Sequence, residues 1–545
     1  MGTSLPVNLK DALDRLAYSY GDYCIWIDAL CINQRDDAEK MQQVSLMGRI
    51  FSEAAEVLIW LPDRGEQLQY VEEETQASAG AEQEDDTVSV EAGLHALQKL
   101  ADDRHFHELG GADECRSSDC PSIELASCSG SWRSTLKSLC IWMDVPWFQR
   151  TWTVQEVVLA RHATLLCGSY SLPWATVTEA WMNWNVHMDS CCLECVFDLT
   201  PGDYQLLHRF SEQVLFLVQA VGRFRSGQDL LTALLRFRAN KSSDDRDKIY
   251  GLLGLQSGEK TMSIRPDYTL SLRQVFVKTA ADLMTQQGWL FPLHLELNHV
   301  VEGLPSWVPD WTYVNTDPSA YFIDRFEDAR TYHAARGMSV VASVVDGATL
   351  IVQGLDFDTI TSVSCAFRLQ RTQAEELGVI NLWRDFLDLE SCAEEAYVAG
   401  GKFGEVAAWT MFADRFHDVD NVRQVNGRDF QAWQDELLRL GQQFGLEGPT
   451  AKTGLHPTVA SCNTAILRRR LCRTAKGYLG LCPEAAEPGD DIFVLGGAPC
   501  PIFLRLRSNS EGGAVYTALG HGYLHGIMDG EAVGIGLPTV DVHIA

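Results

Sequence analysis

The stretch that most constrains the fold runs from Tyr23 to Leu61, where strand-like and helix-like patterns follow one another closely. The run 24–27 is short, bulky and apolar and stops at Asp28, which predicts a buried strand. Apolar residues then recur at helical spacing over 41–54, and a second apolar run, 57–61, closes the unit. Strand, polar loop, helix and strand in this order are typical of a right-handed parallel crossover.

Three polar residues follow the first predicted strand, namely Asp28, Asn33 and Gln34. Ligands of open parallel sheets gather where strands end in loops, so these side chains are candidate contacts for a nucleotide or a ribose. They also fit a purely structural role, with Asp28 capping the loop and the two amides bonding backbone groups before the helix. The residues alone leave both interpretations open.

Composition excludes several classes of protein. A chain of 545 residues with 46% apolar content can bury a large core, and its length suggests two to four domains. The 74 acidic residues outnumber the 44 basic ones, which argues against a broad surface for nucleic acid or anionic membranes. Neither a signal peptide nor an apolar run long enough for a membrane span is evident. A soluble cytoplasmic protein is therefore expected.

The 16 cysteines are diluted along the chain, and some, such as Cys24, Cys167 and Cys472, fall inside apolar runs. Reduced core thiols are the expectation for most of them. Two groups invite a test for metal binding: Cys115, Cys120 and Cys128, and His187, Cys191, Cys192 and Cys195. Zinc sites usually combine two pairs of closely spaced ligands, and neither group has an evident second pair. No metal site is predicted.

The remaining chain suggests a first domain at 1–285, interrupted at about 63–133 by an insertion whose acidic start predicts disorder. Segment 286–335 contains the word LPSWVPDW and is expected to be a rigid connector rich in Trp and Pro. A mixed α/β region, 336–545, follows, with a small β module at about 468–545. In this module, His521 and His525 are four residues apart, but Gly522 and Gly526 argue against a helix that would place both imidazoles on one face. A structural role is therefore favoured over a metal site.

Three ordered words carry a family resemblance: WIDALCINQ at 26–34, PWFQRTWTVQEVVLA at 146–160 and DDRDKIYGLLGL at 244–255. They resemble the fungal heterokaryon-incompatibility (HET) domain, a distant relative of Toll/interleukin-receptor (TIR) domains. The resemblance implies a TIR/flavodoxin-like, doubly wound parallel sheet followed by a helical region and the β module. Such domains normally begin with a strand ending in a word like SYxWG, so the first strand is expected to be missing here.

The same resemblance implies a role in non-self recognition and regulated cell death, with other proteins or further copies of the chain as partners. In NAD-cleaving TIR domains a W-C-x-x-E-L word carries the catalytic glutamate, and W-T-V-Q-E-V is similar to it. Glu156 would then be catalytic and Trp152, four residues earlier, would help to bind NAD, which is implied as substrate and not as a resident cofactor. One carboxylate suits this chemistry, because it stabilises an oxocarbenium-like transition state.

Other interpretations stay open at this point. Glu156 also fits an ordinary helix residue paired with Arg150 or Arg161. The protein could be a signalling scaffold without catalysis, or a diverged enzyme that binds a small metabolite in its Trp-rich centre. No GxGxxG, Walker A, HExxH or GxSxG word occurs, so dinucleotide oxidoreduction, P-loop phosphoryl transfer and lipase-type hydrolysis lack their usual motifs.

Overall fold

In the computed structural model, the described residues are mainly 7–20, 24–61, 89–109, 145–189, 230–256, 263–417 and 457–545, with short gaps in the last two ranges and short pieces elsewhere. They belong to two compact units, Met1–Thr261 with Arg265–Thr269, and Met262–Ile264 with Leu270–Ala545. The predicted connector 286–335 is therefore part of the second unit. The acidic segment 63–86 and the cysteines 115, 120, 128 and 195 lie outside the described residues.

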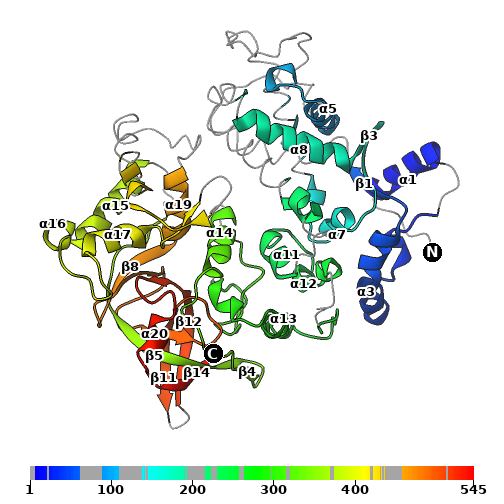
Figure 1. The fold of residues 1–545 in the computed structure, drawn as a ribbon. Coiled ribbons are helices and arrows are strands. Elements are labelled where there is room, and N and C mark those ends of the chain that lie inside the picture. The colour runs from blue at the N-terminus through cyan, green and yellow to red at the C-terminus, as the bar shows by residue number, and fades with distance from the viewer. Residues whose placement is uncertain are drawn as a thin grey trace. The chain divides into compact units, whose positions relative to one another are not determined.

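The first unit combines short strands with helices (Figure 1). Its elements are α1 (Val7–Tyr20), α2 (Asp28–Cys31), α3 (Asp37–Glu53), β1 (Val57–Leu61), α5 (Val90–Ala101), η1 (Phe106–Glu108), η3 (Pro146–Gln149), α7 (Thr153–Val158), β2 (Ala163–Cys167), β3 (Tyr170–Pro173), α8 (Trp174–Asp189), α11 (Leu230–Arg236), α12 (Asp247–Tyr250) and η4 (Leu253–Leu255). β1 pairs in parallel with β2, and β2 forms an antiparallel hairpin with β3. The helix and the second strand predicted from the opening stretch are confirmed.

The first predicted strand is wrong. Residues 24–27 are extended but form no ladder with any described strand, and Ile25 is 44% exposed. Trp26 packs edge-on against Phe51 of α3 at 6.1 Å between ring centroids. The chain turns into α2 at once, since the amide of Cys31 donates to the carbonyl of Ile27. The bulky run is therefore partly covered by a helix, which a pattern of apolar residues does not distinguish from pairing in a sheet.

Part of the predicted disordered insertion is a packed helix. Ser89 caps α5 by accepting from the amide of Ala92 at 3.1 Å, and Leu94, Leu97 and Leu100 are fully buried. α5 packs along α8 (Figure 1). The leucines recur at helical spacing, which indicates an amphipathic helix. The predicted insertion at about 63–133 wrongly extends the disorder of its acidic start over this helix.

The second unit holds a β-rich region and its own helices. Its elements are α13 (Leu272–Gln287), η5 (Phe291–His294), α14 (Ser319–Ala329), β4 (Ala342–Val345), β5 (Thr349–Val363), α15 (Gln373–Leu387), α16 (Leu389–Cys392), α17 (Phe403–Met411), β6 (Phe416–His417), β7 (Val422–Arg423), α19 (Pro457–Ile466), β8 (Arg469–Thr474), β9 (Leu479–Pro483), β10 (Asp491–Leu495), β11 (Ile502–Ser510), β12 (Gly513–His521), β13 (Tyr523–Leu524), α20 (Glu531–Gly534) and β14 (Thr539–Ile544).

Five of these strands close into a ring, because pairing runs from β10 through β11, β12, β14 and β5 back to β10. β5 supplies the closure: its residues 350–355 pair with β14, and 354–359 pair with β10. Its end continues to β8, β9 and β13. The predicted β module is thus real but incomplete by itself, since it needs a strand that precedes it by over a hundred residues.

The LPSWVPDW word is built into this unit. Trp307 and Trp311 are buried, and the Trp307 indole Nε1 donates to the carbonyl of Ala348 at 2.7 Å. Ser306 Oγ donates to the carbonyl of Ala545 at 2.6 Å, which ties the word to the chain end. The word therefore fastens the β5 and β14 region of one unit.

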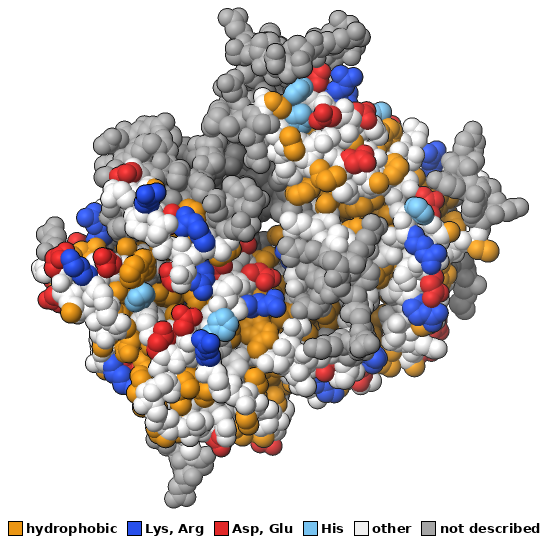
Figure 2. All heavy atoms as spheres, in the orientation of Figure 1, with side chains coloured by type: hydrophobic (Ala, Val, Ile, Leu, Met, Phe, Trp, Pro, Cys, Tyr) orange, Lys and Arg blue, Asp and Glu red, His pale blue; other side chains and the backbone are white. Residues whose placement is uncertain are grey.

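The described helices include none that is both long and apolar enough to cross a membrane. On the face drawn in Figure 2, Lys and Arg side chains are interspersed with acidic and apolar ones. Among the residues described on this face, the mixture leaves no broad basic area.

Candidate functional site

The short helix α7, which carries the WTVQE word, is held by side chains at its start. Thr153 Oγ1 lies 2.7 Å from the carbonyl oxygens of both Trp147 and Arg150, and it donates into this pair. The segment before α7 is also fixed, because the amide of Thr151 donates to the carbonyl of Lys241 at 3.0 Å. α7 therefore presents its side chains from a defined position.

Glu156 is half-buried on α7, and its carboxylate Oε2 accepts a hydrogen bond from the Trp147 indole Nε1 at 2.7 Å. Burial raises the pKa of Glu156 above its ordinary value, although the Trp147 bond and the charge of Arg150 oppose that rise. The Asp28 carboxylate is near enough to raise the pKa further. Two residues selected from distant words of the sequence, Asp28 and Glu156, thus share one electrostatic environment.

The loop residues predicted beside Asp28 mainly build the loop. Asn33 Oδ1 accepts from the amide of Arg35 at 3.2 Å, and Gln34 Nε2 donates to the carbonyl of Asp28 at 3.5 Å. The Asn33 amide donates to Glu39 Oε1 at 3.0 Å, in the first turn of α3. Asp28 itself is exposed and accepts from the amide of Ala29 at 2.7 Å. These contacts match the structural alternative, with all three side chains open to solvent.

Trp152 lies one turn from Glu156 but has another partner. Its indole Nε1 donates to Asp247 Oδ2 at 3.2 Å, and Tyr268 donates its hydroxyl to Asp247 Oδ1 at 2.7 Å. Burial raises the pKa of Asp247, against the two hydrogen bonds that lower it. Lys40 Nζ covers the Tyr268 ring at 3.9 Å from its centroid. Trp152 therefore joins the WTVQE word to the DDRDKIYGLLGL word, and its bond is internal.

A close backbone approach completes this junction. Gln155 is buried and donates from Nε2 to the carbonyl of Gly251 at 2.7 Å. A Cβ placed on Gly254 would lie 2.3 Å from Gln155 Oε1 and 2.9 Å from the Cα of Gly48 on α3. Only glycine fits there, and its small size lets α3, α7 and η4 pack closely against one another.

The sequence reasoning missed Trp147 as a functional neighbour, although it stands in the same word as Glu156. Two Trp side chains of the Trp-rich centre, Trp174 and Trp184, are buried in the first unit's core. In the second unit, His521 is buried beside Arg469, and His525 Nδ1 lies 2.7 Å from the Tyr523 hydroxyl. The structural role expected for both histidines fits these contacts.

Comparison with known proteins defines the class. Residues 1–156 match the family described as heterokaryon incompatibility protein (HET), and residues 409–535 match the Het-6 beta-barrel domain. These two matches confirm the family resemblance, and the word at 26–34 lies within the HET match. The barrel match omits β5 and β14, which the ring needs for closure.

One relative covers nearly the whole chain. The Neurospora crassa protein named "Heterokaryon incompatibility protein 6, OR allele" is 26% identical over 585 aligned positions, which span 93% of this chain and 81% of that protein. No solved structure matches the chain.

Because the pKa of Glu156 is raised, the pH dependence of stability tests whether its negative charge stabilises the fold. A carboxyl whose folded-state pKa is raised favours the protonated form, so its contribution to stability is fully present below its unfolded pKa of about 4.3 and is lost as pH rises through the folded value. Glu156→Gln, which keeps an acceptor for Trp147, should therefore unfold at the same or a higher temperature than wild type at pH 7 to 8. This difference should vanish toward pH 4 in circular-dichroism melts. A variant that is less stable at neutral pH would show that the charge is structural.

Proposed function

We propose that this protein acts in fungal non-self recognition as an incompatibility-type protein, and that its first unit cleaves NAD through Glu156. The first part is supported by the HET match over residues 1–156 and by the similarity to a Neurospora protein whose name states incompatibility. The TIR/flavodoxin-like fold belongs to the proposal, and the parallel β1 and β2 pair supports it. Loss of NAD would then link recognition to regulated cell death.

The observation that carries the enzymatic part is the setting of the Glu156 carboxylate. Burial raises the pKa of Glu156 and the neighbouring Asp28 raises it further, so its negative charge is disfavoured in the free protein. An oxocarbenium ion that develops as nicotinamide leaves would neutralise that charge, so the interaction would be stronger in the transition state than with bound NAD. The Trp147 bond at 2.7 Å fixes one carboxylate oxygen and leaves the other for a ribose hydroxyl.

The test is nicotinamide release by the purified full chain at high concentration, with and without a clustering agent. We expect Glu156→Gln to reduce turnover by about a hundredfold or more, because the transition-state charge loses its partner. The exposed Glu179 on α8 offers a matched control, and Glu179→Gln should turn over NAD as wild type does. Turnover by wild type should also rise with pH through the raised pKa of Glu156.

A clustered wild-type protein that releases no nicotinamide would contradict the enzymatic part, and so would equal turnover by Glu156→Gln. The second candidate, a scaffold without catalysis, is favoured by one observation: within the described residues, β1 pairs on one side only, with β2. An edge strand can accept a strand from another chain. Self-association of the first unit without NAD turnover would support that candidate.

A further inference from the structure

The end of α5 is fastened to α8, and this contact brings two distant parts of the chain together. Asn183 Nδ2 on α8 donates to the carbonyls of Leu100 and Ala101 at 2.9 and 3.2 Å. The chain then turns back, and the Phe106 ring packs at a tilt against Trp184, with 4.6 Å between ring centroids. His105 therefore lies beside the last turn of α8.

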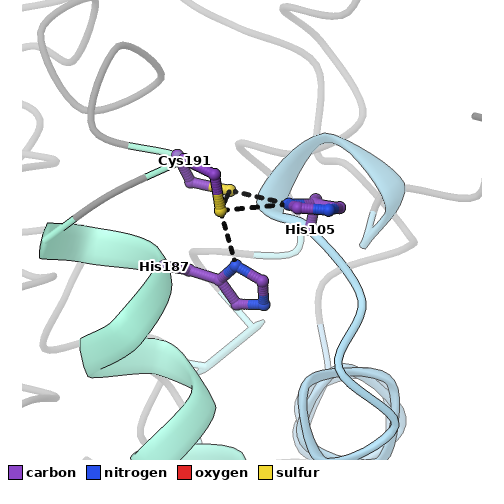
Figure 3. A group of neighbouring side chains, drawn as sticks. His105, His187 and Cys191 are labelled. Carbon is purple, nitrogen blue, oxygen red and sulfur yellow. Dashed lines mark hydrogen bonds between the residues drawn. The ribbon is translucent and has the colours of Figure 1, made fainter. Parts of the chain in front are cut away.

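Four side chains meet there. His187 Nδ1 lies 3.0 Å from Cys191 Sγ, and His105 Nδ1 lies 3.4 Å from Cys191 Sγ and 3.5 Å from Cys192 Sγ (Figure 3). The two sulfur atoms are 3.9 Å apart. All four ligand atoms fall within 4.8 Å of one another. His187 and Cys192 are buried, His105 is half-buried and Cys191 is exposed, so the group lies at the edge of the unit.

These distances are close to the separations between the ligand atoms of a tetrahedral metal site. With Zn–S near 2.3 Å and Zn–N near 2.0 to 2.1 Å, a tetrahedral site separates two sulfurs by about 3.8 Å and a sulfur from a nitrogen by about 3.5 Å. The measured sulfur–sulfur distance is 3.9 Å, and the two sulfur–nitrogen distances from His105 are 3.4 and 3.5 Å. The distance from His187 Nδ1 to Cys191 Sγ is shorter, at 3.0 Å, and no pair of ligand atoms is more than 4.8 Å apart. A disulfide would need sulfurs about 2.05 Å apart.

A carboxylate stands behind one imidazole. Asp103 Oδ1 lies 3.3 Å from His187 Nε2, the ring nitrogen that faces away from the sulfurs. Metal-binding histidines regularly donate their second N–H to a carboxylate, which fixes the ring and its tautomer. Asp103 has φ +60°, in the left-handed region, so the turn after α5 holds an unusual conformation at this residue.

We propose that His105, His187, Cys191 and Cys192 bind one Zn²⁺ ion and that the ion fastens the end of α5 to α8. Binding would release the two thiol protons, and two thiolates would balance the charge of the ion while both imidazoles stay neutral. Four protein ligands leave no open position, so the site is structural and takes no part in the NAD chemistry. Two imidazoles with two thiolates suit zinc better than calcium or magnesium, which prefer oxygen.

The first experiment measures metal in the full chain, purified under reducing conditions without chelator. Elemental analysis should find about one zinc per chain, and the Cys191→Ser, Cys192→Ser double variant should lose it. The matched control is Cys31→Ser, an exposed thiol in α2 of the same unit, which should keep the ion. Cobalt exchanged into wild type should show visible bands of tetrahedral geometry and thiolate-to-cobalt charge transfer, a readout that needs no variant.

A milder variant tests the carboxylate. Asp103→Asn keeps a residue type that tolerates the left-handed conformation, and it should weaken zinc binding about 10- to 100-fold in chelator competition. Asp102→Asn, at the adjacent residue, should bind as wild type does.

Two results would overturn the proposal. One is a reduced wild-type chain that neither contains zinc nor takes up zinc or cobalt, and the other is a double Ser variant that keeps full metal content. Fast alkylation of Cys191 by iodoacetamide in a metal-free wild type, slowed by His187→Asn, would identify an imidazole-activated thiol instead.

Discussion

Asp310→Asn should destabilise the second unit by about 3–5 kcal/mol, since it removes charge-assisted hydrogen bonds from a fully buried carboxylate. Asp310 Oδ2 accepts from the amides of Val300 and Val301 at 2.7 and 2.8 Å. Its Oδ1 accepts from the amide and the hydroxyl of Thr312 at 2.8 and 2.5 Å. An Asn side chain has one acceptor, and its NH₂ group would face backbone donors.

The pH dependence of this effect has a defined sign. Burial raises the pKa of Asp310, but the bonds from Thr312, Val301 and Val300 together lower it below its ordinary value. Stability from a carboxyl with a lowered pKa is present above the unfolded value of about 3.9 and is lost as pH falls through the folded value. The gap between wild type and Asp310→Asn should therefore narrow below about pH 4.

Denaturant unfolding of the full chain, followed by fluorescence and by proteolysis of the second unit, measures this gap. Asp541→Asn on β14 is the matched control, because Asp541 is exposed, and its cost should stay within about 0.5 kcal/mol. A loss of under about 1 kcal/mol for Asp310→Asn would mean that water replaces the lost bonds.

The sequence predicts local elements well where their packing is local. The spacing of apolar residues predicts α3 and the strand 57–61 correctly, because an amphipathic helix and a buried strand have different periods. The same pattern wrongly predicts a strand at 24–27, where Trp26 packs on α3. Apolar spacing cannot predict the closure of the barrel, since the pairing of β5 with β14 joins residues far apart in the chain.

The candidate site shows the same limit. The family motif put Glu156 forward and the end of a predicted strand put Asp28 forward, and the structure places both in one electrostatic environment. Spacing brought His187, Cys191 and Cys192 forward but could not find His105, which comes from a segment predicted to be disordered. The residue that the sequence group lacked, His105, precedes η1, and the α5 and α8 contact brings it to the end of α8.

A buried basic cluster in the second unit gives the other large effect. Arg469 Nη2 lies 2.7 Å from His521 Nε2, and both side chains are buried. His294 stacks on His521 at 5.1 Å, and its Nδ1 lies 3.0 Å from the carbonyl of Leu290. Burial lowers the pKa of His294 to about 4, and burial with the charge of Arg469 holds the pKa of His521 well below its usual range. Both imidazoles are neutral at pH 7, and His521 accepts from the guanidinium.

His521→Phe should cost about 3 kcal/mol at pH 7, because a buried guanidinium loses its acceptor while the ring stack is kept. Adding Arg469→Met removes the buried charge and should restore most of that loss, a coupling that a double-mutant cycle measures. Histidines with lowered pKa contribute stability that is lost as pH falls below about 6.5, so wild type should lose more stability than His521→Phe between pH 6.5 and 4. Additive costs in the cycle, or parallel pH profiles, would show that Arg469 does not depend on His521.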